Sequence, residues 1–537
     1  MLEGFVPWPD EVAARYRDLG VWRGESLLVD LRRPATDPRP LALVDAERTL
    51  TRGQLWDAVA TRARGLLTCG LEPGDRMVIQ LPNSTDLVIT FLSCLWSGII
   101  PVMALPGHRR AELVHIASVA TARAMCVSST PAPDIDFLEL AAQVAHEVPS
   151  LEILVEDGLR CAGISLDDIS RAGTGIQAEP YEAAGSEIAL FLLSGGTTGL
   201  PKLIARTHDD YAYNIRQSSA VSALGPESRY LVALPAGHNF PLGCPGILGT
   251  ISHGGLVIVA ASPSERGSFS LAREYRPTIS AVVPAVAISW MESEARDALA
   301  SLDVLQVGGA RLNPEVAQQV KPRLGCTLQQ VFGMAEGLLN YTHLDDPDTT
   351  IVASQGRKVS TLDEITVVDD HDHPVGPGEV GELLTRGPYT IRGYFRAPEH
   401  NARSFTSDGF YRTGDLVRVD EHGNITVEGR SKDHINRGGE KISSEEIENV
   451  VLAHPHVINA AAVGMPDAKL GERICVFVET SGPVTLEEIL EIFVEKGSAS
   501  FKAPERLEIV EALPLTNVGK VDKAALRGGL TTAGKGT

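Results

Sequence analysis

Cysteine is sparse and scattered in this chain, and basic residues are outnumbered by acidic ones. The 537 residues include seven cysteines, an odd number with no CxxC pair. This pattern argues against a disulfide framework or a zinc site and predicts a reduced, cytoplasmic protein. The net charge of −21 argues against non-specific nucleic-acid binding. The first residues lack a basic stretch followed by an apolar run, so we expect no signal peptide.

The sequence also predicts no membrane-spanning segment. Residues 87–107 carry no charged side chain and are long enough to span a bilayer. Gly98 and Pro101 divide this stretch, however, and no second span accompanies it. We therefore expect a buried helix at 87–97 followed by a buried strand at 99–105, with no membrane association.

The first four-fifths of the chain alternates apolar, strand-like segments with helical ones. Hydrophobic residues make up 43% and charged residues 22% of the sequence, an ordinary balance for a globular protein with two or more domains. The strand-like segments are residues 75–81, 122–127, 229–234, 255–260 and 279–284. Near-continuous apolar strands separated by helices predict an α/β fold with sheets covered by helices on both faces.

The pattern of apolar and polar residues changes after about residue 360. Short alternating strands at 364–369, 381–386 and 424–429 predict a small antiparallel β-barrel or sandwich. A separate unit begins near residue 432, where a capping signal at Ser443 opens a helix. The sequence thus predicts a large N-terminal domain at 1–431, made of two βα-layered sheets plus a barrel-like part at about 360–431, and a small α+β C-terminal domain at 432–537.

An apolar strand ending at residue 193 runs into a Gly/Thr-rich turn. The turn contains Ser194, Gly195, Gly196, Thr197, Thr198 and Gly199, with Lys202 just beyond. Its glycines let backbone N–H groups converge on an anion, while the hydroxyls and the lysine add hydrogen bonds and charge. The GxxxxGK[ST] spacing of a P-loop is absent. We predict a phosphate-binding loop, with a plain surface loop as the alternative.

Two further segments are typical of pocket walls. His238 and Asn239 form a polar pair beside Phe240, between apolar residues and helix breakers. Downstream, Gly308 and Gly309 end a strand and allow a flat ring to approach the backbone closely. A core histidine and a simple tight turn are the respective alternatives.

Five residues in the second half of the chain are candidates for handling a nucleotide. Phe332 is suited to stack on a purine, and Glu336, in apolar surroundings, is suited to hold Mg²⁺ beside phosphates. Asp415 is expected in a turn, where its carboxylate can accept both hydroxyls of a ribose; an Asx turn is the alternative. Arg430 lies in the charged, glycine-rich stretch at 428–441, which resembles a flexible junction between domains, and Lys520 follows a glycine near the C-terminus.

Taken in order, these segments resemble the adenylate-forming enzymes over nearly the whole chain. Within that family the chain is similar to the stand-alone aryl acid–AMP ligases of siderophore and related nonribosomal pathways. The similarity is carried by residues 5–11, 104–110, 206–211, 238–239 and 330–337. Phe332 and Ala335 stand where the wider family has Tyr and Thr, a change that the aryl subgroup shares.

The resemblance implies two half-reactions. ATP and an aryl carboxylate give an aryl-adenylate and pyrophosphate, and the aryl group then passes to the phosphopantetheine thiol of an aryl carrier protein. It implies that Lys520 and His238 are catalytic, with Lys520 at the carboxylate and α-phosphate. It further implies that residues 194–202 bind phosphates and that Glu336 binds Mg²⁺. Adenine would be surrounded by Gly309, Val331 and Phe332, and the ribose would be held by Asp415 and Arg430. A mobile C-terminal domain would rotate at Lys432.

The acid-binding pocket implied by the resemblance favours salicylate. It comprises His238, Asn239, Phe240, Cys244, Gly308, Gly309, Val331, Ala335 and Leu339. Asn239 is expected to bind a 2-hydroxyl, whereas Cys244 and Leu339 stand where 2,3-dihydroxybenzoate enzymes carry Ser and Val. A thiol is a poor partner for a 3-hydroxyl, and an unpaired buried hydroxyl costs about 1–3 kcal/mol. The bulkier leucine adds roughly 1–3 kcal/mol of discrimination.

Several alternatives stay open at this point. 2,3-Dihydroxybenzoate, 3-hydroxypicolinate and anthranilate are competing acids, and free CoA is a competing acceptor for an enzyme of the same fold. A non-catalytic binding protein is disfavoured by the joint presence of Lys520, Glu336, Asp415 and Arg430. The sequence does not set the oligomeric state.

Overall fold

The computed structural model describes residues 2–33, 37, 40–132, 135–158, 163–194, 200–430, 434–437, 440–467, 470–496, 502–516 and 520–533. The chain divides into two compact units. The first contains residues 1–196, 200–364 and 385–411, and the second contains residues 197–199, 365–384 and 412–537. The boundary expected between residues 431 and 432 falls in the second unit, outside the described residues, and stays a prediction.

The described part of the first unit contains a seven-stranded sheet with the order β7-β6-β5-β3-β4-β8-β9. All neighbours are parallel except β8 and β9, which are antiparallel. Apolar side chains fill both faces of its inner strands, as the continuous apolar runs predicted. Its strands are β3 (Arg76–Gln80), β4 (Ile100–Met103), β5 (Ala124–Val127), β6 (Ile153–Glu156), β7 (Ile164–Ser165), β8 (Ile188–Leu193) and β9 (Leu203–Thr207).

A second, nine-stranded sheet in this unit has the order β16-β15-β14-β13-β12-β10-β11-β1-β2 among the described strands. Its centre, from β14 to β1, is parallel, and both edges are antiparallel. The strands are β1 (Leu41–Val44), β2 (Thr49–Thr51), β10 (Arg229–Val232), β11 (Leu256–Val259), β12 (Ile279–Val282), β13 (Val304–Gly308), β14 (Thr327–Met334), β15 (Gly337–Tyr341) and β16 (Arg357–Lys358). Two βα-layered sheets were predicted, and the α/β fold is confirmed.

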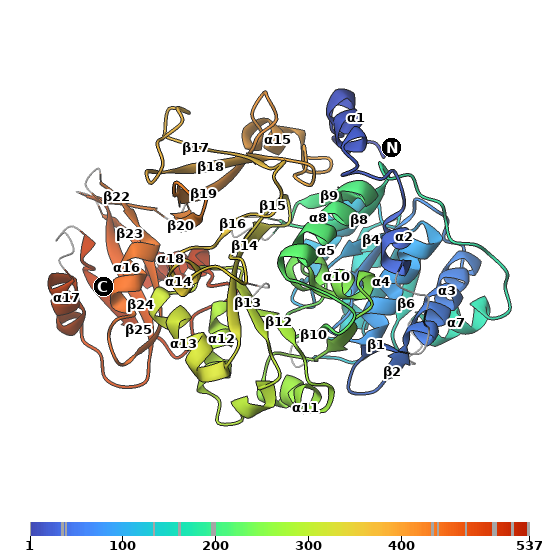
Figure 1. Cartoon of the computed structure of the whole chain (residues 1–537), viewed down its shortest axis with the longest axis horizontal. Helices are drawn as coiled ribbons and strands as arrows, with labels where there is room; N and C mark the ends of the chain where they lie inside the picture. The colour runs from blue at the N-terminus through green and yellow to red at the C-terminus, as the bar shows by residue number, and fades with distance from the viewer. Residues whose placement is uncertain are drawn as a thin grey trace. The chain divides into compact units, whose positions relative to one another are not determined.

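Helices cover these sheets, and Figure 1 shows α3 and α7 side by side. The helices of the first unit are α1 (Asp10–Asp18), α2 (Leu27–Arg32), α3 (Arg52–Thr68), α4 (Thr85–Ser97), α5 (Arg110–Ala120), α6 (Phe137–Glu147), α7 (Leu166–Gly173), α8 (His208–Val221), α9 (Asn239–Gly243), α10 (Gly246–Ser252), α11 (Glu265–Tyr275), α12 (Pro284–Glu292), the 3₁₀ helix η1 (Arg296–Leu299), α13 (Pro314–Leu324), α14 (Asp348–Ala353) and α15 (Pro398–Ser404).

The uncharged run at 87–107 forms α4 and β4, as predicted. Ser84 caps α4 by accepting a hydrogen bond from the Leu87 N–H, and Gly98 ends the helix at φ 73°. Almost every side chain of α4 is buried. Within the described ranges, the structure contains no helix that is both long and apolar enough to cross a membrane.

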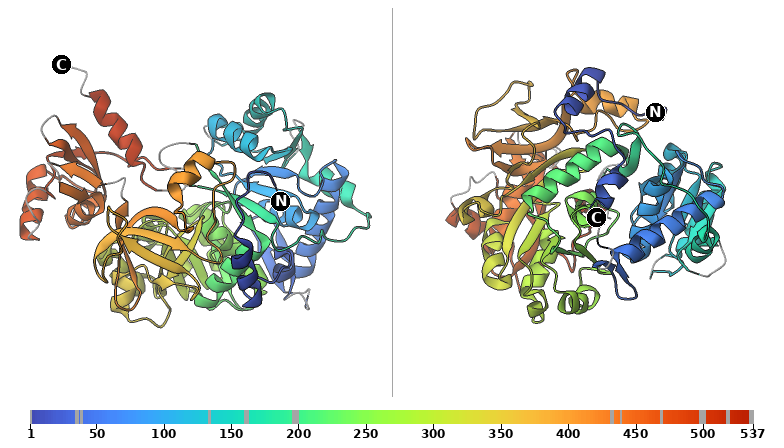
Figure 2. Two further views of the ribbon diagram at one scale, coloured as in Figure 1. Left: turned by 90° about the horizontal axis from the view of Figure 1, so that it is seen from above. Right: turned by 45° about the vertical axis from the view of Figure 1, so that its right-hand side comes forward.

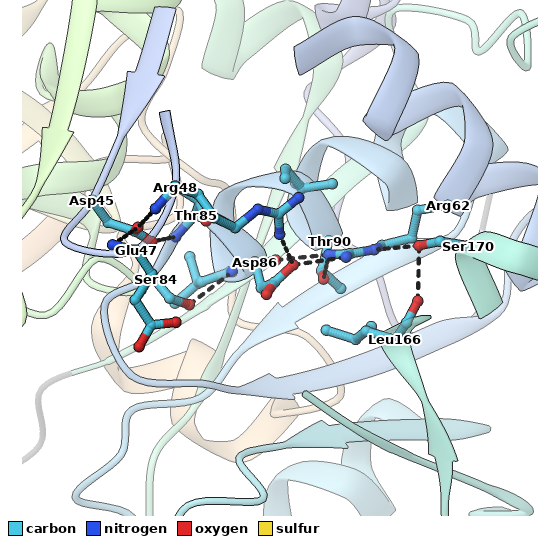
Figure 3. Close-up of polar contacts among 12 residues, drawn as sticks. Asp45, Glu47, Arg48, Arg62, Ser84, Thr85, Asp86, Thr90, Leu166 and Ser170 are labelled. Atoms are coloured by element: carbon cyan, nitrogen blue, oxygen red, sulfur yellow. Dashed lines mark hydrogen bonds and ion pairs between the residues drawn. The ribbon is translucent and has the colours of Figure 1, made fainter. Parts of the chain in front are cut away.

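A polar network at the start of α4 ties the two sheets of the first unit together (Figure 3). Asp45, in the β1–β2 turn, accepts from the backbone N–H of Thr85 at 2.8 Å. Asp86 in turn binds the guanidinium groups of Arg62 at 2.7 Å and Arg48 at 2.9 Å. Because Arg62 is buried on α3, its pairing with Asp86 avoids leaving an uncompensated charge inside the protein.

The second unit contains most of a four-stranded sheet and a five-stranded sheet among its described residues. The short strands predicted after residue 360 form the first of these. Its strands are β17 (Glu364–Val368), β18 (Val380–Arg386), β19 (Tyr411–Val419) and β20 (Ile425–Arg430). The other sheet contains β21 (His434–Arg437), β22 (Glu440–Ser443), β23 (Val457–Asp467), β24 (Gly471–Thr480) and β25 (Arg506–Ile509), with helices α16 (Ser444–Val451), α17 (Leu486–Glu495) and α18 (Lys523–Ala533).

Alternation along β23 gives the five-stranded sheet two apolar faces. Ala460 and Ala462 pack into a core with α16 and α17, whereas Ala461 and Val463 pack into a core with α18. In Figure 2, α18 is the red helix beside the orange strands of this sheet. The described residues of the charged stretch at 428–441, predicted as a flexible junction, belong to β20, β21 and β22. Strand pairing there satisfies backbone groups that a solvated linker would leave to water.

Candidate functional site

The predicted phosphate loop connects the antiparallel strands β8 and β9. Its base is closed twice: the Ser194 N–H donates to the Lys202 carbonyl at 3.0 Å, and the Lys202 N–H donates to Ser194 Oγ at 3.0 Å. Gly195, Gly196, Thr197, Thr198 and Gly199 lie outside the described residues. A hairpin therefore delivers the loop, with both of its anchoring residues hydrogen-bonded to each other.

Lys202 and Glu336, predicted from distant motifs, meet at Tyr394. The Lys202 Nζ lies 5.6 Å from the centroid of the Tyr394 ring, and the Tyr394 hydroxyl donates to Glu336 Oε1 at 2.7 Å. A second phenol, Tyr411, lies 2.9 Å from the Tyr394 hydroxyl. Burial and the Glu336 charge raise the pKa of Tyr394 far above its usual value, so Tyr394 stays a proton donor. The sequence analysis did not predict a role for Tyr394 or Tyr411, because no motif around either residue indicates a polar function.

Arg206 connects the strand after the loop with the segment that carries Glu336. It is fully buried and pairs at 2.7 Å with Asp210, which lies four residues further on, in the first turn of α8. Its other nitrogens donate to the carbonyls of Ala335 at 2.9 Å and Tyr389 at 3.2 Å. Burial raises the pKa of the Asp210 carboxyl and the guanidinium charge opposes that rise. Arg206 thus positions the backbone next to the carboxylate predicted to hold the metal.

The predicted acid pocket begins at α9. His238 caps this helix, with Nδ1 accepting from the Phe240 N–H at 3.3 Å. The Asn239 amide donates to Cys244 Sγ at 3.3 Å, and the Asn214 amide donates to the same sulfur at 3.8 Å. Burial raises the pKa of the Cys244 thiol to about 12, so it remains neutral. The prediction placed Asn239 and Cys244 in one pocket, and the structure brings them into direct contact.

Two glycines let the pocket walls close on each other. A Cβ at Gly308 would lie 2.8 Å from the Val331 carbonyl oxygen and 3.1 Å from the Phe240 ring. A Cβ at Gly333 would lie 2.5 Å from Leu339 Cδ2. Both positions are therefore packed too closely for a side chain without a shift of the neighbours. The approach of a ligand ring to Gly308 stays a prediction. The neighbouring Gly309 has a φ of 83°, a conformation that favours glycine, and Phe332 is half-buried on β14.

Two buried hydrogen bonds in series fix the backbone of Leu339. The Leu339 N–H donates to the Tyr389 hydroxyl at 3.1 Å, and that hydroxyl donates to Asp363 Oδ2 at 2.5 Å. The preceding residue, Leu338, has a φ of 40°, so this backbone depends on external support. Asp363 and Tyr389 therefore position a residue of the predicted pocket.

The buried Asp363 carboxyl gives a testable pH dependence. Burial raises its pKa from 3.8 to about 7, so between about pH 4 and pH 7 the folded state keeps a proton that the unfolded state releases. The stability this group contributes is complete below the unfolded pKa and is lost as pH rises through the folded pKa. We expect the unfolding free energy of the wild type, relative to Asp363→Asn, to fall by about 1.4 kcal/mol per pH unit in that window.

Urea unfolding of both proteins between about pH 5.5 and about pH 8 measures this difference. The matched control is Asp297→Asn, at an exposed side chain, which should show no such slope. A constant difference between the wild type and Asp363→Asn across this range contradicts the expectation.

Asn83, between β3 and α4, clamps the segment that leads to His238. Its amide nitrogen donates to the carbonyls of Leu234 and Ala260, each at 2.9 Å. Its amide oxygen accepts from the Ala236 N–H at 2.7 Å. Three bonds from one side chain therefore fix the approach to the pocket. The sequence analysis missed Asn83, because an asparagine after a strand is an ordinary turn residue.

The second unit carries the remaining predicted residues. Asp415 is buried, but it lies inside β19 and not in the turn that we expected. Gly414, at φ 70°, and the bond from the Asp415 N–H to Thr413 Oγ1 at 3.0 Å reproduce turn-like features within a strand. Its backbone pairs in register with Arg430 on β20.

Lys520 closes a short loop in the second unit. The Thr516 N–H donates to the Lys520 carbonyl at 2.6 Å, and the Lys520 N–H donates to Thr516 Oγ1 at 3.2 Å. The predicted hinge residue, Lys432, lies outside the described residues. The roles of Lys520, Asp415 and Arg430 toward a nucleotide stay predictions.

The chain belongs to the AMP-binding enzyme family. Residues 31–395 match the AMP-binding enzyme domain, and residues 446–520 match the AMP-binding enzyme C-terminal domain. The protein is therefore a ligase of the adenylate-forming class, whose members use ATP, as the sequence motifs indicated.

Several characterised relatives align with almost the full chain. A salicylyl-CoA synthase / salicylate adenylyltransferase of Streptomyces sp is 50% identical over 540 residues, covering 98% of this chain and 97% of the relative. A 2,3-dihydroxybenzoate-AMP ligase of Bacillus subtilis is 47% identical, covering 98% of each. A salicyl-AMP ligase / salicyl-S-ArCP synthetase of Mycobacterium tuberculosis is 44% identical, covering 98% and 94%. The apo structure of Mycobacterium smegmatis MbtA is 42% identical, covers 98% of both chains and superposes with a TM-score of 0.76.

Proposed function

We propose that this enzyme activates salicylate with ATP and passes the salicyl group to the phosphopantetheine thiol of an aryl carrier protein. In the first step a carboxylate oxygen attacks the α-phosphorus, and the bond to the β-phosphate breaks to release pyrophosphate. In the second step the thiol sulfur attacks the acyl carbon, AMP leaves, and the thiol proton is lost to solvent. Relatives named for salicylate and for 2,3-dihydroxybenzoate support an aryl acid as the substrate.

The environment of Cys244 carries the preference for salicylate. Its sulfur already accepts from Asn239 and Asn214, and it is only 1% exposed. A 3-hydroxyl donor placed here would find a weak acceptor whose lone pairs are occupied, at a cost of about 1–3 kcal/mol. Leu339, which packs against Gly333, is the second residue that we assign to this corner of the pocket. Both features favour a ring with no 3-hydroxyl.

The first unit also offers a site for the phosphates and their cation. Glu336 is 8% exposed and uses Oε1 to accept from Tyr394. A carboxylate oxygen is the hard donor that Mg²⁺ takes alongside phosphates, and one or two carboxylates suffice. When bound, Mg²⁺ neutralises charge on the phosphates. Lys202 at the base of the loop adds positive charge, and the ammonium of Lys520 is suited to the negative charge that develops at the α-phosphate.

The names of the relatives divide over the acceptor, since one is a CoA synthase and another forms a carrier-protein thioester. Incubating the enzyme with ATP, salicylate and either CoA or a phosphopantetheinylated aryl carrier protein separates the two. Thioester formation on the carrier is expected, and exclusive use of CoA contradicts the carrier assignment. We place both steps in the cytoplasm, where free thiols such as the six described cysteines persist.

Pyrophosphate exchange with a panel of aryl acids tests the substrate. Salicylate is expected to give the highest kcat/KM, above 2,3-dihydroxybenzoate, 3-hydroxypicolinate and benzoate. Faster exchange with 2,3-dihydroxybenzoate than with salicylate would overturn the choice of acid while leaving adenylation intact. Absence of exchange with every aryl acid would overturn the function itself.

The double variant Cys244→Ser, Leu339→Val should shift this preference. A serine hydroxyl pairs with a 3-hydroxyl, and valine releases the space of one methylene. Each change is worth roughly 1–3 kcal/mol, so the ratio of kcat/KM for 2,3-dihydroxybenzoate to that for salicylate should rise at least about 10-fold. Cys326→Ser, at a buried cysteine in a different core cluster, is the control. An unchanged ratio in the double variant means that these residues do not contact the ring.

A further inference from the structure

A fully buried phenol behind the pocket is bonded to the residue expected to contact the substrate. Tyr211, on α8, donates its hydroxyl proton to Asn239 Oδ1 at 2.8 Å. On its far side, the Asn239 amide nitrogen donates to Cys244 Sγ at 3.3 Å. Burial raises the pKa of Tyr211 well above its usual value, so this hydroxyl remains a donor. The two hydrogen bonds that link Tyr211, Asn239 and Cys244 therefore run in one direction, from the Tyr211 hydroxyl to the Asn239 carbonyl and from the Asn239 amide nitrogen to the Cys244 sulfur.

That direction fixes the two ends of the Asn239 side chain. If the amide turned over, its nitrogen would face the phenol, and the Tyr211 proton would lose the acceptor that the structure gives it. Leaving a buried donor without a partner is costly enough to favour one orientation of the amide by roughly 5-fold to 150-fold. The carbonyl thus points to Tyr211. Among the residues that the structure describes, the amide nitrogen bonds to Cys244 Sγ alone, which leaves its second N–H for a ligand.

The position of Tyr211 is itself fixed from two sides. The Arg206 guanidinium lies 4.8 Å from the centroid of its ring, and Arg206 is held by Asp210. A Cβ at Gly243 would lie 2.5 Å from the Tyr211 hydroxyl oxygen, so the helix that carries Asn239 packs directly on the phenol. These contacts hold the Tyr211 ring and its hydroxyl oxygen in place beside the Asn239 amide.

We infer that Tyr211 is a positioning residue that makes Asn239 a hydrogen-bond donor toward the acid, and so selects an ortho oxygen over an ortho amine. This inference rests on the proposed function. In salicylate the hydroxyl proton turns to the molecule's own carboxylate, which leaves the oxygen lone pairs facing outward as acceptors. In anthranilate the amine presents a second N–H outward, and its lone pair is delocalised into the ring. An Asn239 N–H meets an acceptor in the first case and another donor in the second.

The test compares Tyr211→Phe with Tyr341→Phe. Both phenols are fully buried, but the Tyr341 hydroxyl donates to the backbone carbonyl of Cys244 at 2.7 Å and does not touch the Asn239 amide. Pyrophosphate exchange gives kcat/KM for salicylate, anthranilate and benzoate, together with the KM for ATP. We expect the wild type to prefer salicylate to anthranilate and Tyr211→Phe to lower that ratio about 10-fold. Tyr341→Phe should leave the ratio within about 3-fold, and the KM for ATP should change in neither variant.

A wild type that does not discriminate between salicylate and anthranilate overturns the inference, as does an unchanged ratio in Tyr211→Phe. If Tyr211→Phe does not fold, Asn239→Asp provides the decision. A carboxylate accepts from Tyr211 and offers only acceptors to the ring, so the ratio should invert toward anthranilate, and a retained salicylate preference overturns the inference. If no aryl acid supports exchange in the wild type, the proposed function fails and this inference falls with it; salicylate activity with an unchanged ratio overturns the inference alone.

Discussion

Lys520→Ala is expected to lower the rate of adenylate formation by about 10²–10³-fold, with little loss in binding of either substrate. The ammonium is proposed to meet negative charge that develops at the α-phosphate, and removing one such electrostatic contact costs this much in other enzymes. The loop bonds between Thr516 and Lys520 use backbone groups and the Thr516 hydroxyl, so the substitution leaves the loop anchored. Single-turnover formation of salicyl-AMP measures the effect.

Two comparisons make this result specific. Transfer of the acyl group from preformed salicyl-AMP should proceed at close to the wild-type rate, because that step forms no bond at phosphorus. Lys502→Ala, which removes a lysine paired with Glu446 in the same unit, should retain full adenylation. Undiminished adenylation by Lys520→Ala would remove this residue from the first half-reaction.

Arg206→Met is expected to destabilise the first unit by about 3–5 kcal/mol. It strips the charge partner from Asp210, whose side chain is fully buried, and removing one member of a buried pair leaves an uncompensated charge. It also leaves the carbonyls of Ala335 and Tyr389 without their donor. Thermal and urea unfolding should both report the loss.

An exposed pair supplies the comparison for Arg206. Arg171, on α7, pairs with Asp168, and the Arg171 side chain is 72% exposed. Arg171→Met should therefore lower the free energy of unfolding by less than about 1 kcal/mol. Adding Asp210→Asn to Arg206→Met should recover part of the loss, because a neutral amide tolerates burial better than a carboxylate. Equal costs for the two arginine substitutions would mean that burial of the Arg206 pair adds no stability.

Periodicity and composition predicted the layers of this fold well. Strands such as β5, β10, β11 and β12 consist of unbroken apolar runs, and such runs are buried on both faces in a parallel sheet. The strands at 434–437 and 440–443 were missed, because their charged residues resemble a linker. These two strands pair with each other, and β21 joins the sheet through β24, which follows later in the chain. Asp415 was predicted in a turn but lies in β19, because the glycine before it, Gly414, is a residue type that is common in turns.

Candidate site residues were predicted where a motif carries its own chemistry or where the family resemblance supplied them. The Gly/Thr loop, Glu336 and the His238–Asn239 pair stand in short patterns, whereas Cys244 and Leu339 were assigned to the acid pocket by the resemblance. Tyr394, Tyr211, Asn83 and Asp363 act through partners far away in the sequence, at separations that no short pattern spans. Their residue types are ordinary in buried helices, strands and turns, so only the three-dimensional contacts reveal them.

The contact between Gly333 and Leu339 imposes an order on any route that reshapes the pocket. A methyl group at position 333 collides with Leu339 Cδ2 at 2.5 Å, so Gly333→Ala alone is an overpacked protein. Valine at position 339 lacks Cδ2, so the same alanine is then expected to fit better, with the Leu338 carbonyl oxygen at 3.1 Å as its nearest neighbour. The two positions are therefore expected to be epistatic, and a lineage or a directed-evolution library is expected to change position 339 before position 333.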